Sequence, residues 1–530
     1  MLEQTVKIDE KIDLKKRIVL ISDTHLTPSG EDFNQKAFDK GMEDINKIKN
    51  VNLYVHLGDI TNTGTLKDYE YAIEQIEKFK PISNAQMYYT IGNHDAKNVG
   101  YLLFEELIGE GKRYFEYEDN KMYILSIDST KPDLASGVIH HKAIEGVKKR
   151  ITQSDRKDKI KIICFHHQTI PIPNTGKERS AIDDSGNMLQ MLLDNKADIV
   201  LNGHRHISNL YNISSPEKNL HIFNAGTFSS NRTRYRELNT YSVIDVENNT
   251  LTFKIVPILE PTFKKEIYRT IEHFNPRNLK PDETSYCKFV QISNTLISED
   301  SKNKETLFDK TIEEVNKIQN VDLVIHAGNL TKNSFEEEFK VAKEKFNKLK
   351  HPYLVVSGPT DSKPPSWEYF WDYFGSLDPI YETEKIFFQG LNSTTQDSKD
   401  GFIGRKKLKT FSEKILYLNR EKIIGVCCFH NLIPTPLSVW KTELIDAGDA
   451  LSQFSRSHVN FVLNSTPSIS FNVKIENTLF SNGGNLEGTH FDGNFVEIDI
   501  YKDGLTILKE HNLKRKQEKI IGKYNTFALV

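Results

Sequence analysis

The stretch Leu57-Gly58-Asp59-Ile60-Thr61-Asn62 decides how the whole chain is interpreted. It begins at the end of an apolar run, 51–57, which has the composition of a buried strand and stops at Gly58 and Asp59. In open α/β sheets, ligands bind in the crevice at the carboxyl ends of the strands. A carboxylate directly after a core strand is therefore a candidate ligand-binding group, and the sequence predicts an α/β fold around it.

Four other apolar runs in the first half also end on side chains that can bind a metal ion. These side chains are Asp23 and His25; Asn93, His94 and Asp95; His166 and His167; and His204 and His206. In an extended segment, side chains two residues apart leave the backbone on the same side, so Asp-x-His and His-x-His each present two ligands together. Five strand ends that deliver oxygen and imidazole nitrogen to one edge predict a metal centre.

The types of ligand restrict the metal. Imidazole combined with carboxylate favours Zn, Fe, Mn or Co over Ca and Mg, which prefer shells made of oxygen. No cysteine belongs to these motifs, which argues against a structural zinc site. Two divalent ions held about 3.5–4 Å apart need a shared anionic bridge and separate terminal ligands, and the motifs contain enough groups for both.

The order and rough spacing of these motifs resemble the calcineurin-like metallophosphoesterase family over about residues 14–250. The resemblance implies a four-layer αββα sandwich and a binuclear centre of Mn, Fe or Zn. The ligands that it implies are Asp23, His25, Asp59 and His206 for one ion, and Asp59, Asn93, His166 and His204 for the other. Asp59 would bridge the two ions.

The resemblance also implies a reaction. A hydroxide shared by the ions would attack phosphorus in line, and His94 would stabilise the transition state or protonate the leaving oxygen. Asp95 either orients the His94 imidazole or is a structural carboxylate of the turn. His167 competes with His166 for its ligand position, and we favour His166 because His430 follows the same Cys-Phe pair in the second half.

Three arginines near the motifs are candidate substrate-binding residues. Arg205 lies inside the last His-x-His motif, and Arg232 and Arg234 lie in a polar loop between two predicted strands. Arginine suits bidentate recognition of phosphate oxygens, although solvation at the surface is the simpler role for each of them.

The second half repeats the first. Val290-Gln-Ile-Ser-Asn294, for example, matches Val19-Leu-Ile-Ser-Asp23, and the repeat predicts a tandem duplication. The candidate ligands are replaced by Asn294 for Asp23, Leu296 for His25, Asn329 for Asp59, Pro359 for Asn93, Thr360 for His94, Thr466 for His204 and Ser468 for His206. His430 and Asp361 are the counterparts that remain, so we expect a degenerate, metal-free domain.

These patterns divide the chain into four parts. We expect a metallophosphoesterase domain at 1–258, a proline-containing linker at 259–283, the degenerate copy at 284–512 and a basic tail at 513–530. The degenerate copy would pack against the active half, form a homo-oligomer, or bind a ligand in its relic cleft.

Composition and charge exclude several classes of protein. With 70 Lys and Arg against 73 Asp and Glu, the net charge is −3, and no overall positive field favours nucleic-acid binding. The four cysteines lie in or beside apolar runs, as reduced core residues do. We find neither a targeting segment nor an apolar run long enough to span a membrane, so we expect a cytoplasmic protein without a membrane partner.

The expected function is metal-dependent hydrolysis of a small phosphate ester. The segment 58–64 and the Gly92-Asn-His-Asp95 motif differ from the Gly-Asp-x-Val-Asp-Arg-Gly and Gly-Asn-His-Glu motifs of the Ser/Thr protein phosphatases in this superfamily. The compact motif set is similar to that of bacterial phosphodiesterases that act on cyclic nucleotides or glycerophosphodiesters. The alternatives are a metal-dependent nuclease and a non-catalytic binding or scaffold protein.

Overall fold

A computed structural model describes most of the chain. The described residues are 15–30, 32–175, 181–215, 219–271, 276–280, 283–302, 304–396, 398–418, 421–437, 444–465, 469–487 and 493–526. The first 14 residues of the expected 1–258 domain, and the positions of Thr466 and Ser468, lie outside this set.

The first half is built from two β-sheets, each with parallel and antiparallel strands, and the helices that connect these strands. Its strands are β1 (Lys15–Ile21), β2 (Leu53–His56), β3 (Met87–Tyr89), β4 (Glu116–Glu118), β5 (Met122–Ser126), β6 (Ile160–Cys164), β7 (Ile199–Asn202), β8 (Asn209–Ser214), β9 (Asn219–Asn224), β10 (Thr240–Glu247), β11 (Thr250–Pro257) and β12 (Lys265–Thr270). Its helices are α1 (Gln35–Asn46), α2 (Leu66–Ile76), α3 (Gly100–Leu107), α4 (His141–Ile151) and α5 (Ser185–Asp194). One sheet has the order β12-β11-β10-β1-β2-β3, and the strands of the other run in the order β8-β9-β7-β6-β5-β4.

Alternating side chains explain why these sheets are stacked between helices. On β1, Ile18 and Leu20 point into the core between the two sheets, whereas Val19 and Ile21 point to the core under α1 to α3. A strand that is buried on both faces carries apolar residues at every position, as the continuous apolar run does here. The helices α4 and α5 cover the outer face of the other sheet. The predicted αββα order of layers is confirmed.

The second half has the same order of elements. Its strands are β13 (Cys287–Ile292), β14 (Leu323–His326), β15 (Tyr353–Val355), β16 (Ile380–Glu382), β17 (Ile386–Gly390), β18 (Ile423–Cys428), β19 (Phe461–Asn464), β20 (Phe471–Ile475), β21 (Thr478–Asn482), β22 (Asn494–Ile500), β23 (Leu505–Asn512) and β24 (Gln517–Asn525). Its helices are α6 (Leu307–Val315), α7 (Glu336–Phe346), α8 (Ser366–Phe374), α9 (Arg405–Ile415) and α10 (Ala447–Arg456). Its six-stranded sheet has the order β24-β23-β22-β13-β14-β15. This order repeats that of the six-stranded sheet β12-β11-β10-β1-β2-β3 in the first half.

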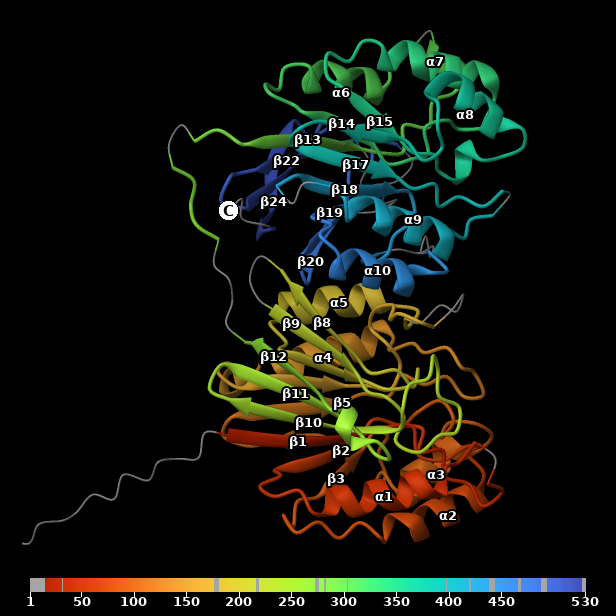
Figure 1. Cartoon of the computed structure of the whole chain (residues 1–530), viewed down its shortest axis with the longest axis vertical. Helices are drawn as coiled ribbons and strands as arrows, with labels where there is room; N and C mark the ends of the chain where they lie inside the picture. The colour runs from red at the N-terminus through yellow and green to blue at the C-terminus, as the bar shows by residue number, and fades with distance from the viewer. Residues whose placement is uncertain are drawn as a thin grey trace, which may run out of the picture.

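The two halves are joined through one continuous sheet. Strand β8 pairs antiparallel with β20, so that the inner strands of both halves form a 12-stranded sheet. Helices α4, α5, α9 and α10 cover one face of this sheet and share one apolar core that draws residues from both halves. Figure 1 shows α1 to α3 at one end of the molecule, α6 to α8 at the other, and α5 and α10 beside the junction.

Two predicted boundaries are wrong. Part of the expected linker, Lys265–Thr270, is β12 and pairs with β11. Half of the expected basic tail, Gln517–Asn525, is β24, which pairs with β23 along its length. Both are edge strands, whose charged side chains protect an exposed edge and hide the alternation expected of a strand.

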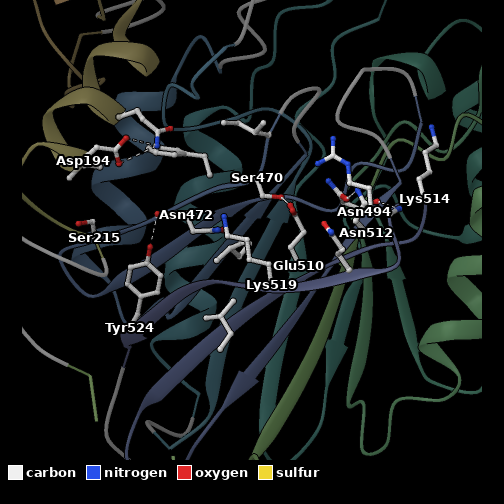
Figure 2. A pocket seen from close by; sticks show the side chains of 18 residues that line it. Asp194, Ser215, Ser470, Asn472, Asn494, Glu510, Asn512, Lys514, Lys519 and Tyr524 are labelled. Atoms are coloured by element: carbon white, nitrogen blue, oxygen red, sulfur yellow. Dashed lines mark hydrogen bonds between the residues drawn. The ribbon is translucent and has the colours of Figure 1, made fainter. Parts of the chain in front are cut away.

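A cavity of about 860 Å³ lies between α5 and the sheet that contains β22 to β24 (Figure 2). Its lining is mixed: Lys519 and Glu510 carry opposite charges, while Asn472 and Tyr524 are joined by a 2.7 Å hydrogen bond from the tyrosine hydroxyl to the asparagine carbonyl. None of the predicted metal ligands lines this cavity. A smaller cavity, described below, contains the predicted chemistry.

Candidate metal centre

An unusual backbone conformation brings the strand ends together. The φ angles are 54° at Asp23, 50° at His25, 54° at Asp59, 71° at His204 and 57° at His206. Positive φ is uncommon outside glycine, and such residues gather at functional sites because the fold must hold them there. The amides of Asp23 and His25 donate to the carbonyls of Gly58 and Asp59 at 2.9 and 3.0 Å, which fixes the end of β1 against the end of β2.

The first group of candidate ligands comes from the loop after β1 and from the loop after β7. His206 Nε2 lies 3.2 Å from Asp23 Oδ1 and 3.0 Å from His25 Nε2. His25 Nε2 also lies 3.8 Å from Asp59 Oδ2. All four residues are buried, so these polar atoms face one another and not bulk water.

The second group shares Asp59 with the first. Asp59 Oδ2 lies 3.2 Å from His166 Nε2. The amide oxygen of Asn93 lies 3.2 Å from the same His166 nitrogen and 2.8 Å from His204 Nδ1. The seven residues implied by the family resemblance therefore lie in two adjoining groups, with Asp59 between them.

The residues fit a pair of cations. His206 Nδ1 lies 2.6 Å from the Arg232 carbonyl, and His166 Nδ1 lies 2.8 Å from the Leu57 carbonyl. Because a carbonyl can only accept, these nitrogens carry the protons and orient the Nε2 atoms towards the site, as partners of metal-bound histidines do. Two ligand atoms about 2.1 Å from one ion, at right angles, are about 3 Å apart, which is close to the 3.0 and 3.2 Å separations here.

The carboxylates of the site favour positive charge at two of its imidazoles, whereas burial lowers the pKa of His25 to about 3 and holds that of His204 well below its usual range. Burial opposes ionisation, but Asp59 outweighs it and raises the pKa of His166 to about 9. The pKa of His206 is also raised, because Asp23 outweighs the effect of burial. Burial likewise opposes ionisation of Asp59, yet the surrounding imidazoles hold its pKa well below the usual range. Carboxylates that raise the pKa of two buried imidazoles against the cost of burial also stabilise a metal cation in the same place.

His94 lies at the mouth of the site. Its Nδ1 lies 2.6 Å from the Asn62 carbonyl, and its ring meets His25 edge-on with the ring centroids 4.6 Å apart. The backbone N–H of His94 donates to Asp59 Oδ1 at 2.7 Å, which ties it to the carboxylate shared by the two groups. The Lys97 ammonium lies 2.9 Å from His94 Nδ1, and burial lowers the pKa of that lysine.

Asp95 has the contacts of a structural residue. Its carboxylate accepts hydrogen bonds from the amides of Ile60, Thr61 and Gly92 at 3.1, 2.7 and 2.9 Å, and from the Thr61 hydroxyl at 3.0 Å. Burial raises its pKa to about 7. Of the two roles left open for Asp95, these contacts support the structural one, because Asn62 contacts the His94 imidazole while Asp95 holds two loops of the site together.

His166, and not His167, faces the metal groups, but the argument from His430 was wrong. His430 Nδ1 lies 2.8 Å from Ser393 Oγ, as His167 Nδ1 lies 2.8 Å from Ser129 Oγ. The position of His166 is occupied by Phe429. A Cβ on Gly58 would lie 2.7 Å from His166, and a Cβ on Gly328 would lie 2.7 Å from Phe429. Matching the Cys-Phe-His letters shifted the alignment by one residue, because Cys427, and not Cys428, is the counterpart of Cys164: Cys427 pairs with the last residue of β17, as Cys164 pairs with the last residue of β5.

The three candidate arginines line a cavity of about 530 Å³ above the metal groups. Arg205 is buried, and its Nη2 lies 3.4 Å from the Thr175 carbonyl. The Arg232 side chain is exposed and pairs with Asp32. Arg234 belongs to the same wall of the cavity. The structure thus brings all three to the site, with Arg232 sharing its charge with a carboxylate.

Sequence comparison identifies this part of the chain. A family model for calcineurin-like phosphoesterases matches residues 16–208. The first half is a calcineurin-like phosphoesterase domain. The matched range contains each of the seven candidate ligands, from Asp23 to His206. This domain is accordingly that of a metallophosphoesterase, an enzyme that hydrolyses phosphate esters with divalent metals.

Individual relatives are distant. The chain is 24% identical over 199 residues to a probable cyclic nucleotide phosphodiesterase of Xenorhabdus bovienii (strain SS-2004), covering 36% of this chain and 78% of that protein. It is similar to the structure of a dimetal phosphatase from Danio rerio, with 11% identity, 48% and 99% of the two chains covered, and a TM-score of 0.36. It is also similar to GAP50, the anchor in the inner membrane complex of Plasmodium, with 16% identity, 49% and 90% covered, and a TM-score of 0.36.

The structure adds residues to the site that the sequence did not single out. Asn62, Lys97 and Asp32 contact His94 or line the same cavity. Asn62 lies in the stretch that follows β2, and this position directly after a core strand could have identified it as a site residue. Lys97 follows the Gly-Asn-His-Asp motif without any pattern of its own. In the described part of the chain, no helix is long and apolar enough to cross a membrane.

Proposed function

We propose that the first half hydrolyses small phosphodiesters, of the cyclic nucleotide or glycerophosphodiester class, with two divalent ions of Mn, Fe or Zn. The observation that carries the proposal is that two groups of ligands share Asp59 and that the cavity above them is lined by arginine. The description of the Xenorhabdus relative as a probable cyclic nucleotide phosphodiesterase supports the diester class.

The size and charge of the cavity support a small anionic substrate. A cavity of about 530 Å³ is within the range that holds single small molecules. Arg205, Arg232 and Arg234 offer guanidinium groups to phosphate oxygens, while Asp32 offsets one of these charges. A polymer would need an extended basic surface, which a net charge of −3 does not favour.

Each residue has a distinct task in the proposed reaction. Asp23, His25 and His206 would hold one ion, and Asn93, His166 and His204 the other, with Asp59 shared. The bound ions would supply a nucleophilic hydroxide and neutralise charge on the ester. Since His94 Nδ1 is held at the Asn62 carbonyl, the remaining nitrogen can pass a proton to the leaving oxygen.

For the second half we propose a tandem duplicate that has lost its metals. Asn294, Leu296 and Asn329 keep the left-handed φ angles of their counterparts, at 53°, 45° and 57°. A leucine has no local reason to adopt this conformation, so we attribute it to an inherited backbone. Asn329 Nδ2 donates to Asn294 Oδ1 at 2.9 Å, and Phe429 occupies the position of His166. A neutral hydrogen bond thus connects the positions where the first half has two carboxylates.

The test combines metal content with turnover. The wild-type chain should bind about two ions and hydrolyse bis-p-nitrophenyl phosphate, cyclic nucleotides or glycerophosphodiesters faster than p-nitrophenyl phosphate. Asp59→Asn should lose hydrolysis and metal, because it removes the shared negative charge. The matched change Asn329→Asp should add no metal in the second half. Two bound ions without diester turnover would refute the proposed substrate class, and metal-dependent cleavage of DNA would replace it with the nuclease alternative.

We also propose that the protein is cytoplasmic. We predict in addition that copies of the chain associate through the second half. Sedimentation of the purified chain at several concentrations tests the latter. A mass that stays at the 61.0 kDa of one chain would contradict it.

A further inference from the structure

The second half reaches the rim of the catalytic cavity. Helix α10 begins against the loop that follows His167, so closely that a Cβ on Gly448 would lie 1.9 Å from the Ile172 carbonyl oxygen. The next residue, Asp449, and Arg405 at the start of α9 then contact two separate segments of the first half.

The first segment leads to Arg205. Asp449 Oδ1 accepts a hydrogen bond from the Asn174 amide at 2.7 Å, and Asn174 has a left-handed φ of 64°. The carbonyl of the following residue, Thr175, lies 3.4 Å from Arg205 Nη2. Arg205 in turn lies between His204 and His206 and lines the cavity. A carboxylate of the second half thus supports the backbone that contacts a candidate phosphate-binding arginine.

The second segment leads to Arg234. Asp449 Oδ2 lies 3.3 Å from Arg405 Nε, and the Arg405 guanidinium lies over the Tyr235 ring, with Cζ 5.1 Å from the ring centroid. Tyr235 directly follows Arg234, which lines the cavity. Tyr235 has a left-handed φ of 50°, a conformation that surrounding contacts must maintain.

We propose that Asp449 and Arg405 are positioning residues of the second half that set the affinity of the first half for its phosphate ester. One carboxylate holds both rim segments, the first through the Asn174 amide and the second through the Arg405 guanidinium. The proposal rests on the proposed function for its substrate and gives the second half a task that needs no metal. Since neither residue reaches the metal groups, their loss affects binding of the ester before it affects turnover.

The experiment uses the full chain with Asp449→Ala and Arg405→Ala. Both variants should raise KM for the diester about tenfold and leave kcat within about twofold. The reason is that the bound substrate and the transition state lose the same binding energy. Arg405→Lys keeps a positive charge for Asp449 but cannot stack flat on Tyr235, so its KM should lie between those of Arg405→Ala and the wild type.

A mirror-image contact supplies the control. Asn187 Oδ1 in α5 accepts a hydrogen bond from the Leu437 amide at 2.9 Å. Leu437, like Asn174, has a left-handed φ, of 55°. Asn187→Ala therefore removes the same kind of contact between the halves, but the loop that it releases belongs to the second half and carries none of the candidate metal ligands. It should cost similar stability and leave KM unchanged.

Two further measurements do not depend on turnover. Hydrogen exchange at 170–175 and 232–237 should accelerate in Asp449→Ala and not in Asn187→Ala. The affinity of the Mn-loaded protein for inorganic phosphate should fall about tenfold in Asp449→Ala. If exchange and phosphate affinity both stay at the wild-type level, the positioning role is wrong. If they change as expected but the wild type hydrolyses no diester, the proposed substrate fails and the positioning role stands.

Discussion

The substitution Gly58→Ala tests whether the turn after β2 positions the metal ligands. Gly58 has a φ of 94°, and an added Cβ would lie 2.7 Å from His166 Nδ1 and 2.8 Å from the Gly92 amide nitrogen. The left-handed backbone costs an alanine about 1–2 kcal/mol, and the overpacking costs about 1–3 kcal/mol more. We expect the free energy of unfolding to fall by about 2–5 kcal/mol.

A second glycine makes the same test without a metal site. Gly328 has a φ of 99°, and its added Cβ would lie 2.7 Å from Phe429 and 3.1 Å from the Gly358 amide nitrogen. Gly328→Ala should therefore destabilise the chain by a similar amount, about 2–5 kcal/mol. Only Gly58→Ala displaces the His166 nitrogen from the Leu57 carbonyl, and loss of such a partner weakens metal binding by about 10–100-fold.

The assay is urea unfolding together with titration of Mn into chelator-treated protein. The reasoning predicts that both variants shift the unfolding midpoint and that only Gly58→Ala loses metal affinity. Equal loss of metal affinity in the two variants would show that general destabilisation, and not the position of His166, controls the site. Wild-type metal affinity in Gly58→Ala would refute the role given to this turn.

Further predictions concern individual ligands, metal and pH. His166→Ala should abolish binding of one ion, whereas His167→Ala should retain two ions by elemental analysis, since His167 Nδ1 is held at Ser129 Oγ. Removal of metal by a chelator should lower the free energy of unfolding by about 2.7 kcal/mol for each ion, relative to protein held at 100 times the Kd of both sites, as measured by urea titration. Burial opposes ionisation of Glu497, but His511 and Lys288 outweigh it and lower the pKa of that glutamate to about 2. The resulting stabilisation, about 3 kcal/mol, is present above pH 4.5 and is lost as the pH falls through 2. The free energy of unfolding of Glu497→Gln should therefore fall furthest below that of the wild type at neutral pH, and the difference should vanish towards pH 2.

The sequence was sufficient for the parts of the site that depend on local pattern. Asp59 and Asp23 follow strands that are buried on both faces, and such strands are recognisable from their apolar runs alone. The parallel order of those strands then determines that their ends meet. His204 and His206 were identified for the same reason, because they follow β7.

The remaining features depend on contacts between residues far apart in sequence. His430 was aligned one position out, since only its bond to Ser393 shows that it corresponds to His167. The role of Asp95 is decided by three backbone amides, which have no signature in the side-chain sequence. The contact of Asp449 with Asn174 spans 275 residues, and no pattern within either segment predicts it.

The pairing of β8 with β20 has a consequence for the history of the chain. These strands would be the exposed edges of two separate sheets, and each instead covers the other. Deleting the second half would uncover the β8 edge together with its share of the common apolar core, and such surfaces promote aggregation. Under the proposed duplication, mutually protected edges let the second half lose its metal ligands far more easily than its strands. Retention of a copy without metals then needs no activity of its own, because its strands cover the edge and the shared core of the first half.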